Sequence, residues 1–270
     1  MEKTHKALTI AGSDSGGGAG IQADIKTFQE LKVYGMTAIT AITAQNTLGV
    51  QDVYPLPVET ILNQLKSIAD DLPPQSLKTG MLFSSELIEA VSDSIKTFNW
   101  GNVVVDPVMV AKGGARLLQE EAVQAVKKNL LPLATIVTPN IPEAEVLTGR
   151  QIFTLEDRQE AAKVLFDCGV EHVVIKGGHG QEEMAVDLYY NGIEFETLSS
   201  PRIHTKNTHG TGCTFSAAIT AYLAKGCTVF EAVEGAKRYI HMAIKHDLHI
   251  GSGHGPTNHW AHRLEGVKLG

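Results

Sequence analysis

Short apolar runs alternate along the chain with longer segments of helical periodicity. In those segments apolar residues recur at spacings of three and four, as at Ile21, Ile25, Phe28 and Leu31. The apolar runs are rich in Val, Ile and Thr, which is typical of buried parallel strands, and they cover Ala7–Ala11, Met36–Thr43, Val103–Val105, Thr135–Val137 and His172–Ile175. This alternation predicts an α/β fold with a mostly parallel central sheet and helices on both faces.

One stretch departs from this pattern. The strand-like segments Ala185–Tyr190 and Ile193–Leu198 flank Asn191-Gly192, which is a strong hairpin signal. We expect an antiparallel hairpin there, at one edge of the sheet. The Pro73-Pro74 pair indicates the end of a helix rather than a linker between domains. Residues 1–270 are therefore predicted to form a single domain.

Composition and charge narrow the class of protein. The 270 residues are 43% hydrophobic and 20% charged, which predicts a globular chain with a large core. A net charge of −7, without any run rich in Lys or Arg, disfavours nucleic acid as a partner. No window approaches 18 apolar residues, so we expect no membrane span. Three cysteines without a CxxC pair favour a reducing compartment, and we predict a cytoplasmic protein.

A glycine-rich turn is the first candidate for chemistry. The segment His209–Cys213 contains two glycines and precedes an apolar helical run that continues to about Lys225. Bare backbone N–H groups at a helix N-terminus bind anions, although the same pattern also fits a plain helix start. Cys213 falls in the first helical turn, where the helix dipole favours the thiolate. The alternative for Cys213 is a small buried packing residue.

Polar side chains also follow three of the predicted strands. Asp106 follows one strand, Asn140 and Glu143 follow the next, and Lys176 follows a third. Ligands of doubly wound sheets bind beyond the carboxyl ends of the strands. A lysine there can reach phosphate oxygens, and Asn140 and Glu143 carry oxygen ligands suited to Mg²⁺, unless they only cap a helix. With the glycine-rich turn, this set indicates phosphoryl transfer.

The N-terminal glycines do not form a familiar fingerprint. The stretch Gly12–Gly20 matches neither GxGxxG nor GxxxxGK[ST], so it predicts only a loop of close backbone approach. Six of the eleven histidines lie beyond residue 240 without a recognisable metal spacing. We expect those histidines at the surface or at helix ends.

Taken together in order and spacing, these motifs resemble the ribokinase-like superfamily. The chain is more closely similar to the hydroxymethylpyrimidine/phosphomethylpyrimidine kinases of thiamine synthesis. The similarity runs through nearly the whole chain and rests on Ala11–Ser15, Gly17–Asp24, Thr43–Thr47, Lys78–Met81, Val105–Met109, Thr138–Asn140 with Glu143, His209–Thr214 and Gly253–Thr257.

The resemblance implies a ribokinase-like fold, ATP, Mg²⁺ and a homodimer. It assigns the anion hole and catalysis to Gly210, Thr211, Gly212, Cys213 and Lys176. Most of the superfamily has Asp as the base where this chain has Cys213, so a strong base is not required of it. Nucleotide binding is assigned to Asp106, Asn140, Glu143, Lys176 and Gly212, with Asp106 and Glu143 at the metal.

The resemblance also implies a pocket for a small aromatic alcohol, lined by Gly12, Asp24, Gln45, Met81 and Val108. The Gln45 amide offers one acceptor and two donors, so it can pair with the edge of a 4-aminopyrimidine. The predicted substrate is therefore 4-amino-5-hydroxymethyl-2-methylpyrimidine, together with its monophosphate.

Three alternatives stay open from the sequence. One is a pyridoxal or pyridoxine kinase of the same fold. Another is a binding protein without activity, which would not need Lys176, Asp106, Glu143 and Cys213 together. A sugar kinase would be expected to have a polar pocket and Asp at position 213.

Overall fold

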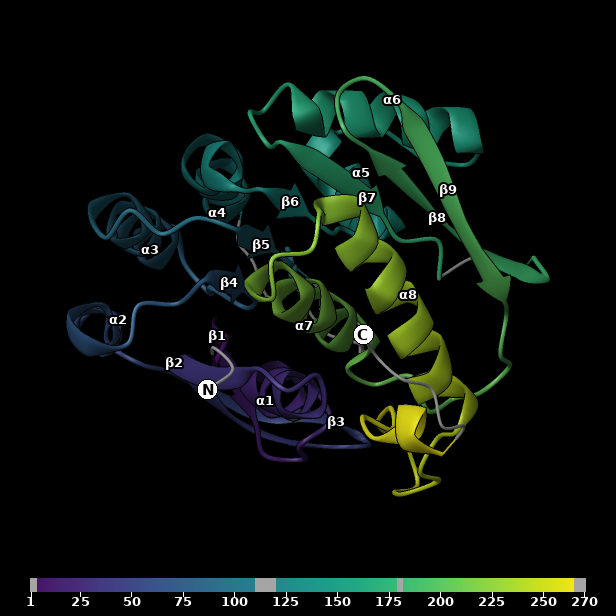
Figure 1. Ribbon diagram of the computed structural model, residues 1–270, viewed down its shortest axis with the longest axis horizontal. Coiled ribbons are helices and arrows are strands. Elements are labelled where there is room, and N and C mark those ends of the chain that lie inside the picture. Colours follow the sequence, from purple (N-terminus) through teal and green to yellow (C-terminus); the bar gives the residue numbers. More distant parts are fainter. Residues whose placement is uncertain (1–3, 110–119, 179–181, 265–270) are drawn as a thin grey trace.

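The computed structural model of the protein describes residues 4–109, 120–178 and 182–264 (Figure 1). Its strands form one nine-stranded sheet in the order β3-β2-β1-β4-β5-β6-β7-β8-β9. The strands are β1 (Lys6–Asp14), β2 (Tyr34–Asn46), β3 (Gly49–Pro55), β4 (Ser76–Thr79), β5 (Val103–Val105), β6 (Ile136–Val137), β7 (His172–Ile175), β8 (Met184–Tyr190) and β9 (Phe195–Pro201).

The centre of the sheet is parallel, as the alternation of strands and helices predicted. Strands β2, β1, β4, β5, β6 and β7 pair in parallel, whereas β3, β8 and β9 pair antiparallel at the two edges. The predicted hairpin of β8 and β9 is confirmed, but its loop is longer than expected. Tyr190 pairs with Phe195, and the Asn191 side-chain oxygen accepts hydrogen bonds from the backbone of Ile193 and Glu194. The Asn-Gly pair thus begins a four-residue loop instead of forming a two-residue turn.

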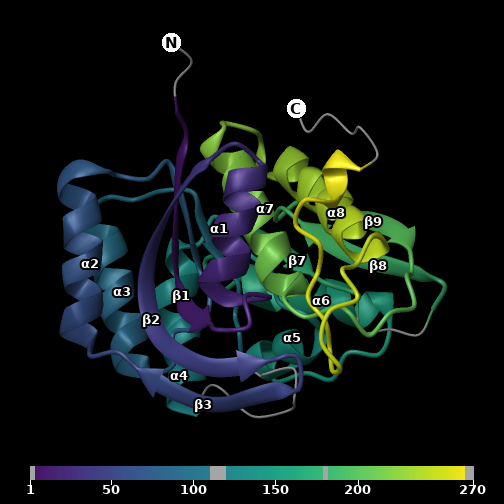
Figure 2. The ribbon, with the colours of Figure 1, turned by 90° about the horizontal axis from the view of Figure 1, so that it is seen from below.

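Helices cover both faces of the sheet (Figures 1 and 2). A hydrophobic core lies on each side of the sheet, and alternate residues of β5 point to opposite sides. Val103 and Val105 pack in the first core, and Val104 packs in the second. The first core is covered by α2 (Val58–Asp71), α3 (Ser85–Thr97), α4 (Glu120–Ala125), the π-helical turn η1 (Val126–Leu130), the short η2 (Leu131–Leu133), α5 (Ile141–Thr148) and α6 (Leu155–Phe166). The second is covered by α1 (Gly20–Glu30), α7 (Thr211–Ala224) and α8 (Val229–Lys245).

Two strands lacked the apolar pattern that identified the others. All four residues of β4 are buried, yet three of them are polar: Ser76 donates to Asn102 O, Lys78 pairs with Asp24, and Thr79 lines a small cavity beside Asp106. Strand β3 lies at the edge of the sheet and is mostly exposed, so its sequence is not constrained to be apolar. The polar residues of β4 are buried and those of β3 are exposed, so neither strand shows the apolar run by which the other strands were recognised.

The segment after α8 ties distant parts of the chain together. His209 forms a bridge with Pro256, and the His254 backbone N–H donates to Thr47 O at 2.8 Å. The segment ends at the short helix η3 (Ala261–Arg263). His259 is buried and lies outside a helix, so the expectation that the C-terminal histidines lie at the surface or at helix ends is wrong for it, whereas His262 is buried within η3. Among the described residues, no helix combines the length and apolar character that a membrane crossing needs.

Candidate active site

The ends of three neighbouring strands bring the predicted polar residues together. Asp106 follows β5, Asn140 follows β6 and Lys176 follows β7, and these strands are adjacent in the sheet. The Lys176 ammonium is 3.1 Å from Asp106 Oδ1, and Asn140 forms a bridge with Lys176. A Cβ atom on Gly212 would lie 3.2 Å from Lys176 Nζ, so the glycine-rich turn lies directly beside this ion pair. The four sequence elements form one site.

Helix α7 presents free backbone donors to that site. It begins after Gly210, which has a φ of 79° and no side-chain cap. A side chain at Gly210 would also collide with the carbonyl of Gly18, so both conformation and space require glycine here. The first N–H groups of a helix have no partner within the helix, and the dipole adds positive potential. Gly212 and Cys213 therefore carry the amides of an anion site.

The ion pair at this site stays charged. Burial raises the pKa of Asp106, but the lysines Lys176 and Lys78 outweigh it and hold that pKa below its ordinary value. Burial lowers the pKa of Lys176, and the Asp106 carboxylate reverses this and raises it. Ser216 Oγ donates to Asp106 Oδ2 at 3.1 Å and fixes the carboxylate from the side of α7. Lys176 can thus offer a full positive charge to an incoming phosphate.

Asn140 and Glu143 form a capping box at the start of α5. The Asn140 backbone N–H donates to Glu143 Oε2 at 2.8 Å, and the Glu143 N–H donates to Asn140 Oδ1 at 2.9 Å. This is the capping arrangement that the sequence left as an alternative. Burial raises the pKa of Glu143 to about 7, although nearby Lys176 opposes it. The carboxyl group is therefore poised between its neutral and charged forms near neutral pH.

The described residues contain no group of three His, Cys, Asp or Glu side chains arranged to hold a metal ion. A pair of buried carboxyl groups nevertheless suits Mg²⁺, which keeps several waters and is commonly held by one or two carboxylates plus substrate phosphates. The donor set at Asp106 and Glu143 fits that mode. Their assignment to the metal stays a prediction.

The thiol of Cys213 is not the acidic group that the helix N-terminus suggested. Its burial raises its pKa to about 12, although Lys78 opposes this. The prediction of a favoured thiolate is therefore wrong, because the loss of solvent outweighs the helix dipole. Behind the thiol lies a buried ion pair, with Lys78 Nζ 2.9 Å from Asp24 Oδ1 and neither side chain exposed. Thr9 also donates to Asp24 at 2.6 Å.

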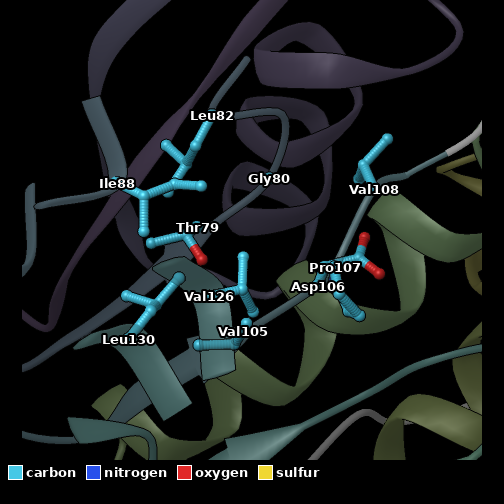
Figure 3. Close-up of a pocket in the computed structure, with 10 residues that line it drawn as sticks. All are labelled: Thr79, Gly80, Leu82, Ile88, Val105, Asp106, Pro107, Val108, Val126 and Leu130. Atoms are coloured by element: carbon cyan, nitrogen blue, oxygen red, sulfur yellow. The ribbon is translucent and has the colours of Figure 1, made fainter. Parts of the chain in front are cut away.

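The five residues predicted to line the alcohol pocket lie around the same region. Met81 packs on Gly12, since a Cβ atom there would be 2.6 Å from Met81 Cε. Val108 stands at one side of a small cavity whose other lining residues include Asp106, Val126 and Leu130 (Figure 3). Asp24, by contrast, has no exposed surface, and a direct contact with the alcohol would require its ion pair with Lys78 to open. The pocket assignments stay predictions.

Gln45 lies beside a residue pair that sequence reasoning missed. Its side-chain nitrogen is 3.2 Å from His209 Nε2, which is in turn 2.8 Å from Asp14 Oδ2. Asp14 also accepts hydrogen bonds from the backbone of Gly16, Gly18 and Ala19. Asp14 could have been recognised from its position before a run of glycines, because an aspartate there can accept hydrogen bonds from the backbone N–H groups of the turn.

Comparisons with known proteins agree with this geometry. Residues 14–258 match the family model described as phosphomethylpyrimidine kinase. The hydroxymethylpyrimidine/phosphomethylpyrimidine kinase of Bacillus subtilis is 56% identical over 258 residues, which cover 95% of each chain. A thiamine biosynthesis bifunctional protein of Geobacter sulfurreducens is 52% identical over 252 residues, covering 93% of this chain and 51% of that protein.

A solved structure gives the same result for the fold. The ADP complex of Bacillus subtilis pyridoxal kinase superposes with a TM-score of 0.91 at 49% identity, and the match covers 97% of this chain and 100% of that one. The predicted ribokinase-like fold is thereby confirmed. With a family model that spans most of the sequence and relatives above half identity, the chain belongs to the phosphomethylpyrimidine kinase family.

Proposed function

We propose that the protein transfers the γ-phosphoryl group of ATP to the hydroxymethyl oxygen of 4-amino-5-hydroxymethyl-2-methylpyrimidine, and then phosphorylates the resulting monophosphate on the way to thiamine diphosphate. The observation that carries this proposal is the contact between the Lys176–Asp106 pair and the uncapped N-terminus of α7 at Gly212. Cation, carboxylate and backbone anion site lie together, as in-line phosphoryl transfer requires.

Each residue then has a separate role in the transfer. The amides of Gly212 and Cys213 bind the oxygens of the transferring phosphoryl group, and Lys176 moves from Asp106 toward the phosphates. A bond forms between the substrate hydroxyl oxygen and phosphorus while the bond from phosphorus to ADP breaks. Bound Mg²⁺ would neutralise phosphate charge, with Asp106 and Glu143 holding it directly or through its waters.

Cys213 contributes as a neutral hydrogen-bonding group in this proposal. A thiol with a pKa of about 12 does not accept a proton near pH 7. The transition state of phosphoryl transfer is loose, so the hydroxyl proton leaves late and a strong base is not needed. The buried Lys78 ammonium near the thiol is paired with Asp24, so charge stabilisation is left to the backbone amides and Lys176.

Pyridoxal kinase activity is the second candidate, and the relationship to the solved pyridoxal kinase favours testing it directly. Release of ADP should be measured with hydroxymethylpyrimidine, its monophosphate, pyridoxine and pyridoxal in parallel. The proposal predicts the highest kcat/KM with the two aminopyrimidines. A kcat/KM for pyridoxal that equals or exceeds those of the aminopyrimidines would favour the pyridoxal kinase. If no alcohol causes release of ADP, a binding protein without activity would be favoured.

We also propose a cytoplasmic homodimer. All three cysteines are free thiols, which suits a reducing compartment. Apolar side chains are exposed on the hairpin of β2 and β3, among them Leu48 and Tyr54, and such a surface commonly contacts another chain. Light scattering of the purified protein tests the dimer, and a monomeric mass at micromolar concentration would contradict it.

A further inference from the structure

Three polar residues from distant parts of the chain meet beside the predicted alcohol pocket. Asp14 ends β1, Gln45 lies near the end of β2, and His209 precedes α7. His209 Nε2 is 2.8 Å from Asp14 Oδ2, and the side-chain nitrogen of Gln45 is 3.2 Å from the same ring nitrogen. The three therefore share one hydrogen-bonding centre, His209 Nε2.

The charge of Asp14 decides which atom carries the proton. Burial raises the pKa of Asp14, but the hydrogen bonds from His209 and from the backbone of Ala19 and Gly16 outweigh this and lower it. Asp14 is thus a carboxylate at neutral pH, and a carboxylate only accepts hydrogen bonds. His209 Nε2 must therefore hold a proton and donate it to Asp14, whether the imidazole is neutral or charged.

This proton fixes the orientation of the Gln45 amide. An amide nitrogen beside His209 Nε2 would place two donors face to face. When the amide is turned by 180°, its oxygen becomes a second acceptor of the His209 Nε2–H, which it shares with Asp14, and its nitrogen faces Thr43 Oγ1, 3.4 Å from the far end of the amide. Thr43 donates its own proton to Ser13 O at 2.8 Å, so its oxygen is free to accept. Only this orientation pairs every donor with an acceptor.

The ring of His209 is also held in place by the backbone around it. A Cβ atom on Gly18 would lie 2.5 Å from His209 Cδ2, so the ring packs directly on that glycine. The His209 backbone N–H donates to Gly255 O at 3.0 Å, and the Thr257 N–H donates to His209 O at 3.3 Å. The ring and the backbone of His209 are both held in place. The Nε2–H therefore keeps a fixed direction, and this direction sets the orientation of the Gln45 amide.

We propose that His209, oriented by Asp14, is a specificity-determining positioning residue that fixes the Gln45 amide. Gln45 then offers a free N–H and a free oxygen lone pair in a defined order. The pocket selects alcohols whose ring edge carries an amino donor beside a ring-nitrogen acceptor. A pyridine ring that lacks the amino group leaves one of these groups unpaired. This inference rests on the proposed function and deepens it.

The test compares two substitutions at one position. His209→Met removes the ring donor, whereas the amide nitrogen of His209→Gln can donate from nearly the same place. We expect His209→Met to lower the ratio of kcat/KM for hydroxymethylpyrimidine to kcat/KM for pyridoxine by about tenfold or more, and His209→Gln to keep it within about threefold. His172→Met is the matched control, because His172 bonds Tyr189 at the opposite end of β7 and should leave the ratio unchanged.

Two further measurements separate this inference from the proposed function. In a Gln45→Leu background, His209→Met should not change the ratio again, because His209 acts through Gln45. Nitrogen NMR of the wild-type protein should show His209 Nε2 protonated at pH 8, a readout that needs no activity. An unprotonated Nε2, or an unchanged ratio in folded His209→Met, overturns the inference. Absence of ADP release with every alcohol would overturn the proposed function, and the NMR result would still decide the orientation.

Discussion

Replacing Glu143 with Gln should stabilise the protein relative to wild type, and this gain in the free energy of unfolding should grow as the pH rises. Glu143 is 6% exposed, and burial raises its pKa from 4.5 to about 7. The folded protein therefore binds this proton more tightly than the unfolded chain does, and ionisation of the group opposes folding. The penalty is absent below pH 4.5, grows as the pH rises toward 7, and is complete above it.

The shift sets the size of the effect. One pKa unit corresponds to about 1.36 kcal/mol, so the rise to about 7 amounts to about 3 kcal/mol of the free energy of unfolding. Glutamine removes the charge and keeps an oxygen that can accept the Asn140 N–H of the capping box. The free energy of unfolding of Glu143→Gln, relative to wild type, should therefore increase by about 2.5 kcal/mol between pH 5 and pH 8, since part of the effect is already present at pH 5.

Urea unfolding at pH 5, 6, 7 and 8 measures this difference. Glu231→Gln is the matched control, because Glu231 holds the same position in the capping box of α8 but is exposed, and hydrogen bonds from Thr228 lower its pKa. A lowered pKa changes stability only in the acid range, so the control should run parallel to wild type over these pH values. Parallel curves for Glu143→Gln as well would refute a raised pKa at Glu143. Glu143→Gln should also require a higher Mg²⁺ concentration for activity, because it lacks a carboxylate that is predicted to hold the metal.

Three further substitutions probe the site. Cys213→Ala should lower kcat about tenfold, the value of one hydrogen bond, without changing the shape of the pH profile between pH 6 and 9; loss of the fall in activity toward low pH would restore the thiol as a base. Gly212→Val should lower kcat by about 100-fold or more while circular dichroism stays native, because its Cβ would lie 3.2 Å from Lys176 Nζ and cover the amide; a smaller loss than in Cys213→Ala contradicts the anion site. Arg202 donates to the carbonyls of Glu182, Met184, Gly177 and Gly178, and the last two directly follow Lys176, so Arg202 holds the backbone beside the proposed phosphate-binding lysine. Arg202→Lys should therefore raise KM for ATP several-fold with little change in KM for the alcohol; equal changes would place its effect elsewhere.

The sequence predicted the site well where the site depends on the direction of the strands. Asp106, Asn140 and Lys176 each follow an apolar run, and parallel strands bring their carboxyl ends to one edge of the sheet. The pair of Asp14 and His209 was missed because 195 residues separate its members and neither lies in a periodic segment. Lys78 was missed as an ion-pair partner for a related reason, since the burial of a lysine is visible only when Asp24 is placed opposite it.

The pKa of Cys213 depends on two opposing effects, the field of the helix N-terminus and the removal of solvent, and their balance can be judged only from the three-dimensional structure. A helix N-terminus can be recognised from two glycines before an apolar run, and its field falls off within the first turn. The removal of solvent depends instead on everything that packs around the thiol, including the buried pair of Lys78 and Asp24, and a backbone hydrogen bond from Gly20 offsets it only in part. Because both charges of that pair lie close to the thiol, their fields on it largely cancel, and the cost of burying a thiolate remains. The protein therefore carries a neutral sulfur at the point where its relatives in the wider superfamily are expected to carry a carboxylate, and transfer has to rely on backbone amides and Lys176 for charge stabilisation.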